Sequence, residues 1–418
     1  MEARSIGVNW TFSPVADLNT NKYNPITNTR ALSDEPGLAK RLLGAMIQGM
    51  QDHGLAAAAK HFPGDGTDDR DQHLVTTRNR LTLAEWRQQH GAVFQELIDR
   101  GVHSIMTGHI SFPAYQTVPA NGIYRPATLC PELSIKLLKQ EMGFGGVIVS
   151  DALTMGGYVK GLGRNVSPAV LEVESFNAGT DMLLWPTLDY FPALEAALKS
   201  GAVPMSRLED ALERIWRMKE TLGLFKPGGT APTLLTASDT AYVGDVARRT
   251  AEGGLTLVWN HQAMLPLRRE AIRRVRIVVI TNHDPILKDF TALKEAFERR
   301  GMEVRMEHYL CDDENGETLQ MVADTNDLLL YALYTRAHMP CGPLNFFEEQ
   351  AGMLWGALTA GMAKSVVVSF GSPYLGHEYF ETAPAYLNAY FPDPATQEAV
   401  VQALLGEIPF CGVSPVRL

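Results

Sequence analysis

The stretch LAAAAKHFPGDGTDDRDQH, residues 55–73, joins a short apolar run to a loop that is rich in titratable side chains. The apolar run predicts a buried strand, and it delivers Lys60 and His61 to the end of that strand. Pro63 and the glycines that follow it interrupt regular structure, because proline fixes φ and glycine tolerates positive φ. The loop then presents Asp71 and His73 close together. Such a cluster on a buried strand indicates an active site, although a polar surface loop has the same composition.

The composition is that of an ordinary globular protein. The chain has 418 residues, of which 45% are hydrophobic and 20% charged, and its formal net charge is −10. This length suffices for two or three domains. The negative charge argues against a nucleic-acid or anionic-membrane partner, and no apolar run approaches the roughly 20 residues that span a bilayer. The cysteines lack CxxC spacing, which predicts reduced thiols and neither a zinc site nor a disulfide framework. They are Cys130, Cys311, Cys341 and Cys411.

The first half of the chain alternates predicted strands with predicted helices. The strands are expected at residues 7–17, 55–62, 102–110, 145–150 and 181–185. They lack period-2 alternation, which is typical of parallel strands buried on both faces. Polar side chains follow at their C-terminal ends, namely Asp17, Lys60, His61, His109 and Asp151. A (β/α)8 barrel gathers such ends into one ring, whereas an open sheet spreads them along an edge. The sequence therefore predicts an α/β fold of the TIM-barrel type.

The domain boundaries follow from a Pro/Gly-rich break. Residues 1–225 are predicted to form the barrel, 226–240 a linker, and 241–418 a smaller α/β sandwich domain. In the second domain, strands are expected at residues 255–259, 275–281, 303–306, 327–334 and 365–370, with helices at 286–300 and 346–360 between them. This domain has neither a P-loop nor a GxGxxG motif, which argues against a nucleotide role. Only five strand–helix units are predicted before residue 225, whereas a complete barrel has eight. We therefore expect the N-terminal strands of the barrel to be missing, and this chain alone to fold or act poorly.

Two residues are the best candidates for catalysis on chemical grounds. Asp151 stands at a strand tip, where a carboxylate is able to attack the anomeric carbon of a sugar. An Asp that caps the next helix is an equally simple explanation. His73 is suited to proton transfer near neutral pH, with Asp71 to orient it, although a solvated Asp-x-His loop is common.

Four further side chains are candidates for binding. Lys60 and Arg30 offer positive charge and hydrogen-bond donors to hydroxyl groups, and an ordinary ion pair is the alternative. His61 and His109 are more often satisfied strand-end residues than ligands.

Several longer motifs carry a family resemblance. The pattern KHFPGDG-x4-DQH at residues 60–73 resembles the KH(F/I)PG(H/D)G-x4-D(S/T)H signature of the β-N-acetylglucosaminidase branch of glycoside hydrolase family 3. VIVSDALTMGG (147–157) is similar to that family's nucleophile segment. GVNWTFSPVAD (7–17) and NTRALSDEP (28–36) resemble its first strand and substrate-arginine segments. VVVSFGSPY (366–374) and the closing segment 389–416 extend the resemblance over nearly the whole chain.

The resemblance implies roles for the matching residues. Asp151 is then the nucleophile of a retaining mechanism, and His73 is the general acid/base, paired with Asp71. A histidine in this role adds no second negative charge near the nucleophile. Arg30, Lys60, His61 and His109 would bind the sugar, and the region of Met155 would accommodate the 2-acetamido group. Gln72 stands where the family has Ser or Thr, which is a mild departure.

The resemblance implies removal of terminal β-linked N-acetylglucosamine from chitobiose-type or peptidoglycan-derived sugars. Alternatives that stay open are a β-N-acetylglucosaminide phosphorylase or β-glucosidase of the same family, and an inactive sugar-binding remnant. A metal-dependent barrel hydrolase that uses His61, His73, His109 and Asp151 is a further alternative. No cofactor and no metal are expected, and the partner is a small carbohydrate. We expect a monomer or homodimer in the cytoplasm, with the reservation that a signal peptide would be missed if the N-terminus is incomplete.

Overall fold

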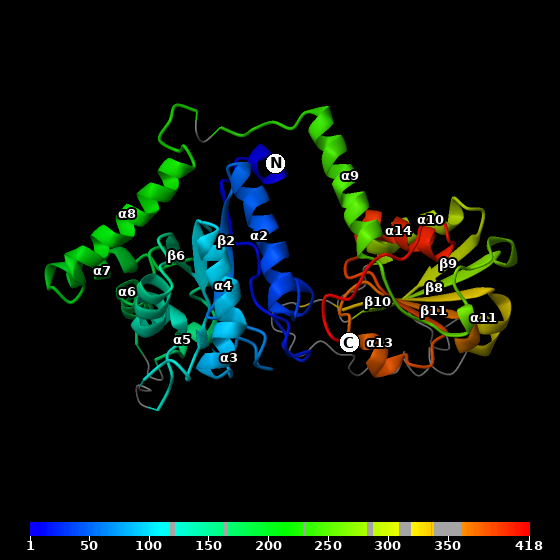
Figure 1. Cartoon of the computed structure of the whole chain (residues 1–418), viewed down its shortest axis with the longest axis horizontal. Coiled ribbons are helices and arrows are strands. Elements are labelled where there is room, and N and C mark those ends of the chain that lie inside the picture. The colour runs from blue at the N-terminus through cyan, green and yellow to red at the C-terminus, as the bar shows by residue number, and fades with distance from the viewer. Residues whose placement is uncertain are drawn as a thin grey trace. The chain divides into compact units, whose positions relative to one another are not determined.

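The computed structural model describes residues 1–117, 122–162, 166–228, 231–281, 287–308, 319–335, 337 and 361–418. These residues fall into two compact units. The first contains Met1–Thr236, and the second begins at Ala237 and includes the C-terminal Leu418. The division follows Thr236, inside the interval 226–240 that the sequence analysis assigns to a linker. Each unit has its own main sheet (Figure 1).

The first unit is built on a curled parallel sheet with the strand order β1-β2-β4-β6. The strands are β1 (Trp10–Thr11), β2 (Ala56–Phe62), β4 (Ser104–Thr107) and β6 (Val147–Ser150). Each neighbouring pair runs parallel, so the C-terminal ends of the strands lie at one edge of the sheet. Two short strands, β3 (Thr77–Arg78) and β5 (Ile110–Ser111), pair in the loops beyond β2 and β4. The predicted α/β fold with parallel strands is confirmed.

Helices connect and cover these strands. They are α1 (Glu2–Ser5), η1 (Asn28–Arg30), α2 (Pro36–Asp52), α3 (Leu83–Gln88), α4 (His90–Asp99), η2 (Ala127–Leu129), the π-helix η3 (Glu132–Glu141), α5 (Gly156–Val159), α6 (Pro168–Asn177), α7 (Tyr190–Lys199) and α8 (Met205–Thr221). The start of α2 shows how the local sequence begins a helix. Glu35 accepts hydrogen bonds from Gly37 N and Leu38 N, and Pro36 occupies the first helical position, where no N–H is needed.

The sheet of the first unit is buried along its strands. Every residue of β2 except Lys60 is buried, and so are all residues of β4 and β6. Leu43 of α2 and Phe94 and Leu97 of α4 belong to the same hydrophobic cluster as β2 and β4. Burial of apolar surface stabilises a fold by about 25 cal/mol per Å². The buried strands therefore give the polar residues at their ends a rigid support.

The second unit is an α/β sandwich around a mixed sheet with the order β7-β12-β11-β10-β8-β9. The strands run parallel except for β7, which is antiparallel to β12. Val275, Ile277 and Val279 belong to the hydrophobic cluster that includes α10 and α14, whereas Val278 and Ile280 belong to the cluster that includes α11 and α13. Figure 1 shows α10 and α14 on one side of this sheet. The predicted α/β sandwich is confirmed.

The elements of the second unit have the following bounds: α9 (Ala237–Gly254), β7 (Thr256–Asn260), η4 (His261–Ala263), η5 (Arg269–Ala271), β8 (Arg274–Thr281), η6 (Leu287–Phe290), α10 (Thr291–Glu298), β9 (Glu303–Glu307), α11 (Leu319–Thr325), β10 (Leu328–Tyr334), η7 (Met362–Lys364), β11 (Ser365–Ser369), α13 (Leu375–Tyr379), β12 (Ala385–Asn388) and α14 (Pro394–Leu404).

One predicted strand of the first unit is reduced to a parallel bridge. Residues 181–185 make a single bridge, between Met182 and Val149. Trp185 has a φ of 62°, which ends the extended backbone. The Met182 backbone pairs with β6 through Ile148 O and Ser150 N, and the Asp181 carboxylate accepts a hydrogen bond from Ile148 N at 2.8 Å. A helix expected at 346–360 lies outside the described residues, as do Cys311 and Cys341.

None of the helices in the described part of the chain combines the length and the apolar character that a membrane span requires.

Candidate active site

The site begins with a buried pair at the end of β2. His61 Nδ1 donates to Asp17 Oδ2 at 2.7 Å, and Asp17 Oδ1 accepts from the backbone N–H groups of His61 and Asp65. Burial opposes ionisation of Asp17, but the charge of His61 and these hydrogen bonds together hold its pKa below the usual value. Because Nδ1 is taken by Asp17, the His61 ring presents Nε2 to the site.

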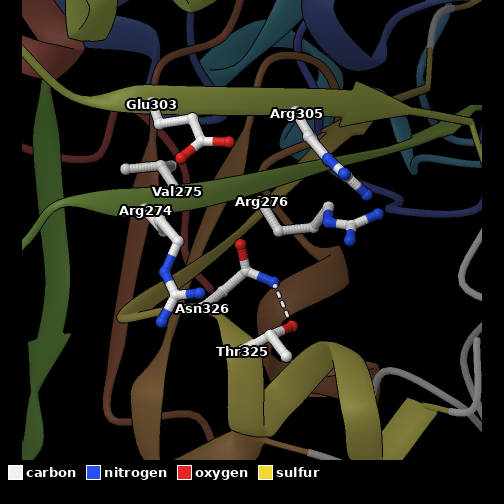
Figure 2. Close-up of a pocket in the computed structure, with 7 residues that line it drawn as sticks. All are labelled: Arg274, Val275, Arg276, Glu303, Arg305, Thr325 and Asn326. Atoms are coloured by element: carbon white, nitrogen blue, oxygen red, sulfur yellow. Dashed lines mark hydrogen bonds between the residues drawn. The ribbon is translucent and has the colours of Figure 1, made fainter.

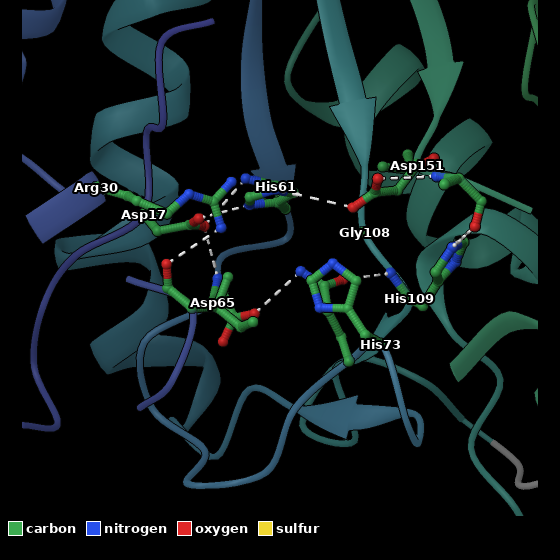
Figure 3. Close-up of polar contacts among 12 residues, drawn as sticks. Asp17, Arg30, His61, Asp65, His73, Gly108, His109 and Asp151 are labelled. Atoms are coloured by element: carbon green, nitrogen blue, oxygen red, sulfur yellow. Dashed lines mark hydrogen bonds and ion pairs between the residues drawn. The ribbon is translucent and has the colours of Figure 1, made fainter. Parts of the chain in front are cut away.

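Asp151 follows β6 and faces that ring. Its Oδ2 lies 3.7 Å from His61 Nε2, and its Oδ1 accepts from Ala152 N at 2.8 Å (Figure 3). Burial alone would raise the pKa of Asp151. The charge of His61, the Ala152 N–H and the charge of Lys60 outweigh burial, so the pKa of Asp151 lies below its ordinary value. The carboxylate is therefore held ionised, as a nucleophile requires.

His73 and Asp71 form the second pair. His73 Nδ1 donates to Asp71 Oδ1 at 2.7 Å, and the same oxygen accepts from His73 N at 2.8 Å. Asp71 is buried, whereas the His73 side chain is 22% exposed. The arrangement fixes the ring orientation and leaves Nε2 to exchange protons with a ligand or with solvent.

The loop of His73 is hydrogen-bonded to the segment that follows Asp151. Gly156 N donates to His73 O at 2.8 Å, and Gly157 N donates to Gln72 O at 3.2 Å. A Cβ at Gly156 would lie 2.4 Å from Leu74 O, so only glycine permits this approach. These two glycines join the two loops closely. In Figure 3 the His73 ring lies beneath His61 and Asp151 at the same end of the strands.

Lys60 and Arg30 bring positive charge to the same edge. Burial and the neighbouring Arg30 lower the pKa of Lys60, while Asp151 and Asp17 act in the opposite direction. Arg30 Nη1 donates to Ile26 O at 3.2 Å. The structure thus brings Lys60, Arg30, His61 and Asp151 together, as the sequence predicts.

His109 occupies a different position from the one expected for a sugar ligand. The residue is 0% exposed, and its Nδ1 and Nε2 are within hydrogen-bond distance of Thr128 Oγ1 and Ala152 O. Burial lowers the pKa of His109, which favours the neutral ring. The ring therefore supports the backbone next to Asp151. Met155 is also buried, directly before α5.

Asp65 is a site residue that the sequence analysis missed. It is 2% exposed, and its Oδ1 accepts from Asn24 Nδ2 at 2.8 Å and from Gly66 N at 2.7 Å. Burial and the negative charge of Asp17 raise the pKa of Asp65 to about 7. The sequence offers one signal for Asp65, which is its position between two glycines of the motif.

Gln72 is the second missed residue. Its Nε2 donates to Asp65 Oδ2 at 3.2 Å, and its Oε1 accepts from His109 N at 3.1 Å. A Ser or Thr side chain is too short to span both contacts. Gln72 therefore connects the His73 segment to Asp65 in the loop after β2 and to the loop after β4.

Within the described ranges, no group of three or more His, Cys, Asp and Glu side chains is arranged to hold a metal ion. His61 and His109 instead use ring nitrogens in protein contacts.

A protein-family comparison decides the affiliation. Residues 1–218 match the model described as the glycosyl hydrolase family 3 N terminal domain, which is more than half of the chain. The chain belongs to glycosyl hydrolase family 3. The predicted family and the predicted class of enzyme, a glycosidase, are confirmed.

Two relatives show how far the family 3 similarity extends. A β-N-acetylglucosaminidase/β-glucosidase of Cellulomonas fimi is 34% identical over 436 aligned residues, which cover 99% of this chain and 75% of that protein. β-Hexosaminidase A of Pseudoalteromonas piscicida is 31% identical over 291 residues, which cover 65% of this chain and 47% of that protein. The match thus spans three quarters of one relative and about half of the other.

Solved structures of family 3 enzymes share the fold. A β-glucoside phosphorylase, BglX, bound to 2FGlc has a TM-score of 0.87 at 27% identity, covering 100% of this chain and 75% of that one. A β-N-acetylglucosaminidase from Paenibacillus sp. has a TM-score of 0.82 at 24% identity, covering 100% and 77%. At the latter identity the likeness concerns the fold alone.

Proposed function

We propose that this protein is a retaining β-N-acetylglucosaminidase, which removes terminal β-linked N-acetylglucosamine from chitobiose-type or peptidoglycan-derived sugars. The observation that carries the proposal is the juxtaposition of an ionised Asp151 with the His73–Asp71 pair, on two loops that are hydrogen-bonded to each other. The names of the family 3 relatives support the choice of sugar.

Asp151 acts as the nucleophile in this proposal. Its carboxylate attacks the anomeric carbon, the glycosidic bond breaks, and a covalent glycosyl-aspartate forms. His73 donates its proton to the departing oxygen. In the second half, His73 removes a proton from water, the water oxygen bonds to the anomeric carbon, and the Asp151–sugar bond breaks. The configuration is retained after the two displacements.

The remaining residues of the site bind the sugar or position Asp151. Lys60, Arg30 and His61 Nε2 are available to the hydroxyl groups of the sugar at the strand edge, and the loop at Met155 would receive the acetamido group. Because His109 is buried with both ring nitrogens engaged, we assign it to positioning Asp151 and not to direct contact with the sugar.

The test is the Asp151→Asn variant assayed with an aryl β-N-acetylglucosaminide and, in parallel, an aryl β-glucoside. We expect turnover of the first substrate to fall at least about a thousandfold, because the nucleophile is lost. Asp99→Asn, at an exposed position of α4, is the matched control and keeps full activity. Trapping wild-type enzyme with a fluorosugar and sequencing the labelled peptide checks the covalent bond to Asp151. Turnover within tenfold of wild type in the variant contradicts the mechanism, and preference for the glucoside contradicts the specificity.

Phosphorolysis is a second candidate. A neutral or cationic His73 adds no negative charge that would repel a phosphate acceptor, and the similar β-glucoside phosphorylase supports this alternative. Rates and products measured with and without inorganic phosphate separate the two. Formation of a sugar 1-phosphate, with faster turnover in phosphate, would replace hydrolysis as the assigned reaction.

A further inference from the structure

The second unit contains a cavity of about 230 Å³ that the proposed glycosidase chemistry does not use. It lies where β8 and β9 begin, next to the end of α11. Its walls are formed mainly by Arg274, Arg276, Glu303, Arg305 and Asn326 (Figure 2). Three guanidinium groups and one carboxylate therefore share a small space.

The strand register concentrates the positive charge. Arg274 is paired across the strands with Glu303, but Arg276 is paired with Arg305. Figure 2 shows the guanidinium groups of Arg276 and Arg305 next to each other. Like charges at directly opposed positions of neighbouring strands are destabilising. Glu307 pairs with Arg276 and offsets part of this charge, and an anion between the two arginines would offset more of it.

Arg276 is built into the protein and is not a chance surface residue. It is 3% exposed, and its Nη1 donates to Glu307 Oε2 at 2.8 Å. A guanidinium fixed in this way is preorganised, because less conformational entropy is lost when it binds a ligand.

The end of α11 does not oppose an anion. Its carbonyl groups would repel negative charge, but Lys364 Nζ donates to Ala323 O at 2.9 Å and to Asn326 O at 3.3 Å. Asn326 Nδ2 donates to Val322 O at 2.8 Å. These contacts occupy the carbonyl oxygens of Val322, Ala323 and Asn326 and add another cation to this end of the sheet.

We propose that this cavity is a binding site for a small anion that carries a phosphate group. Planar guanidinium forks match phosphate oxygens in bidentate fashion. The volume lies below the roughly 300–1,000 Å³ of pockets for drug-sized ligands, which suits phosphate or a small phosphate ester. Glu303 is part of the wall and repels negative charge on the Arg274 side, whereas Glu307, the ion-pair partner of Arg276, is not among the lining residues. The phosphate is therefore placed between Arg276 and Arg305.

Titration calorimetry of the full chain at low ionic strength tests the proposal, with inorganic phosphate and glycerol phosphate as separate probes. We expect saturable binding of at least one probe. Arg305→Gln should weaken it at least tenfold, whereas Arg273→Gln, a charge change outside the cavity, should leave it within twofold. Glu303→Gln should strengthen binding severalfold, a gain that a folding defect cannot produce.

Three outcomes overturn the proposal. They are the absence of saturable binding in the wild type, equal binding in Arg305→Gln and the wild type, and loss of binding in Lys60→Met but not in Arg305→Gln. The last result would place the anion at the candidate active site of the first unit. Activity on the aryl glycoside, measured with the same Arg305→Gln preparation, reports on the first unit and so separates this proposal from the proposed function.

Discussion

At the scale of single residues, His90 is a buried polar group that has no role in the proposed chemistry. It is 0% exposed, and neither ring nitrogen has a hydrogen-bond partner in the described part of the chain. Its ring lies against the Gly64 turn, where a Cβ would come within 2.4 Å of Nδ1. Burial lowers the pKa of His90 to about 4, with a smaller opposing effect of the Asp17 charge. A neutral, unsatisfied imidazole therefore sits beneath the active-site loop.

His90→Leu is predicted to raise the free energy of unfolding at pH 7 by about 1–3 kcal/mol, since it removes the cost of burying unsatisfied polar atoms. The difference should widen in acid. Between pH 6.5 and 4 the unfolded chain binds a proton at His90 that the folded chain does not, so wild-type stability falls as the pH is lowered. Urea unfolding at pH 7 and pH 5 measures both effects. Equal stability of the two proteins at both pH values would contradict the assignment.

At the scale of elements, the turn from β6 into α5 holds the two proposed catalytic loops together. A Cβ at Gly156 would lie 2.4 Å from Leu74 O and 3.1 Å from His73 O. Any larger residue would therefore push the turn away from the His73 loop. Gly145, just before the same strand, is a matched control, because a Cβ added there would meet no other atom within 4 Å.

Gly156→Ala is predicted to lower kcat at least tenfold, because it displaces His73 relative to Asp151 and such misplacement is costly to proton transfer. Gly145→Ala should keep kcat within twofold. Steady-state kinetics on the aryl β-N-acetylglucosaminide provide the measurement, with circular dichroism to compare folding. If Gly156→Ala retains wild-type kcat, the contact between these loops does not position the acid/base.

The sequence predicts a helix or strand well where the residues of that element alone determine it. The apolar runs of β2, β6, β8 and β10 locate those strands closely, because strands buried on both faces need continuous hydrophobic sequence. β12 was missed, because its four residues depend on β11 and β7 for their pairing. The residues of the candidate site divide in the same way, into those with a local sequence signal and those that depend on long-range contacts. Lys60, His61 and Asp151 stand at strand ends that a barrel brings together, whereas the Asp65–Gln72–His109 chain depends on side-chain contacts that no spacing encodes.

At the scale of the whole molecule, each hydrophobic cluster of the described residues draws on one unit. The cluster around β2 and β4 lies within the first unit, and the clusters on the two faces of the six-stranded sheet lie within the second. Each unit contains a comparable aromatic contact. Phe62 and Phe94 meet edge to face at 5.2 Å, and so do Phe290 and Phe370.

Separate cores predict separate unfolding transitions. Phe94→Leu and Phe370→Leu remove equivalent groups from fully buried positions, and each should cost roughly 1–3 kcal/mol. By calorimetry we expect two transitions, with Phe94→Leu lowering the midpoint of one and Phe370→Leu the midpoint of the other, by about 2–8 °C each. Loss of glycosidase activity on heating should follow only the transition that Phe94→Leu moves, because the proposed catalytic residues all stand on the first unit. A single transition that both substitutions shift alike would mean that the two cores unfold together.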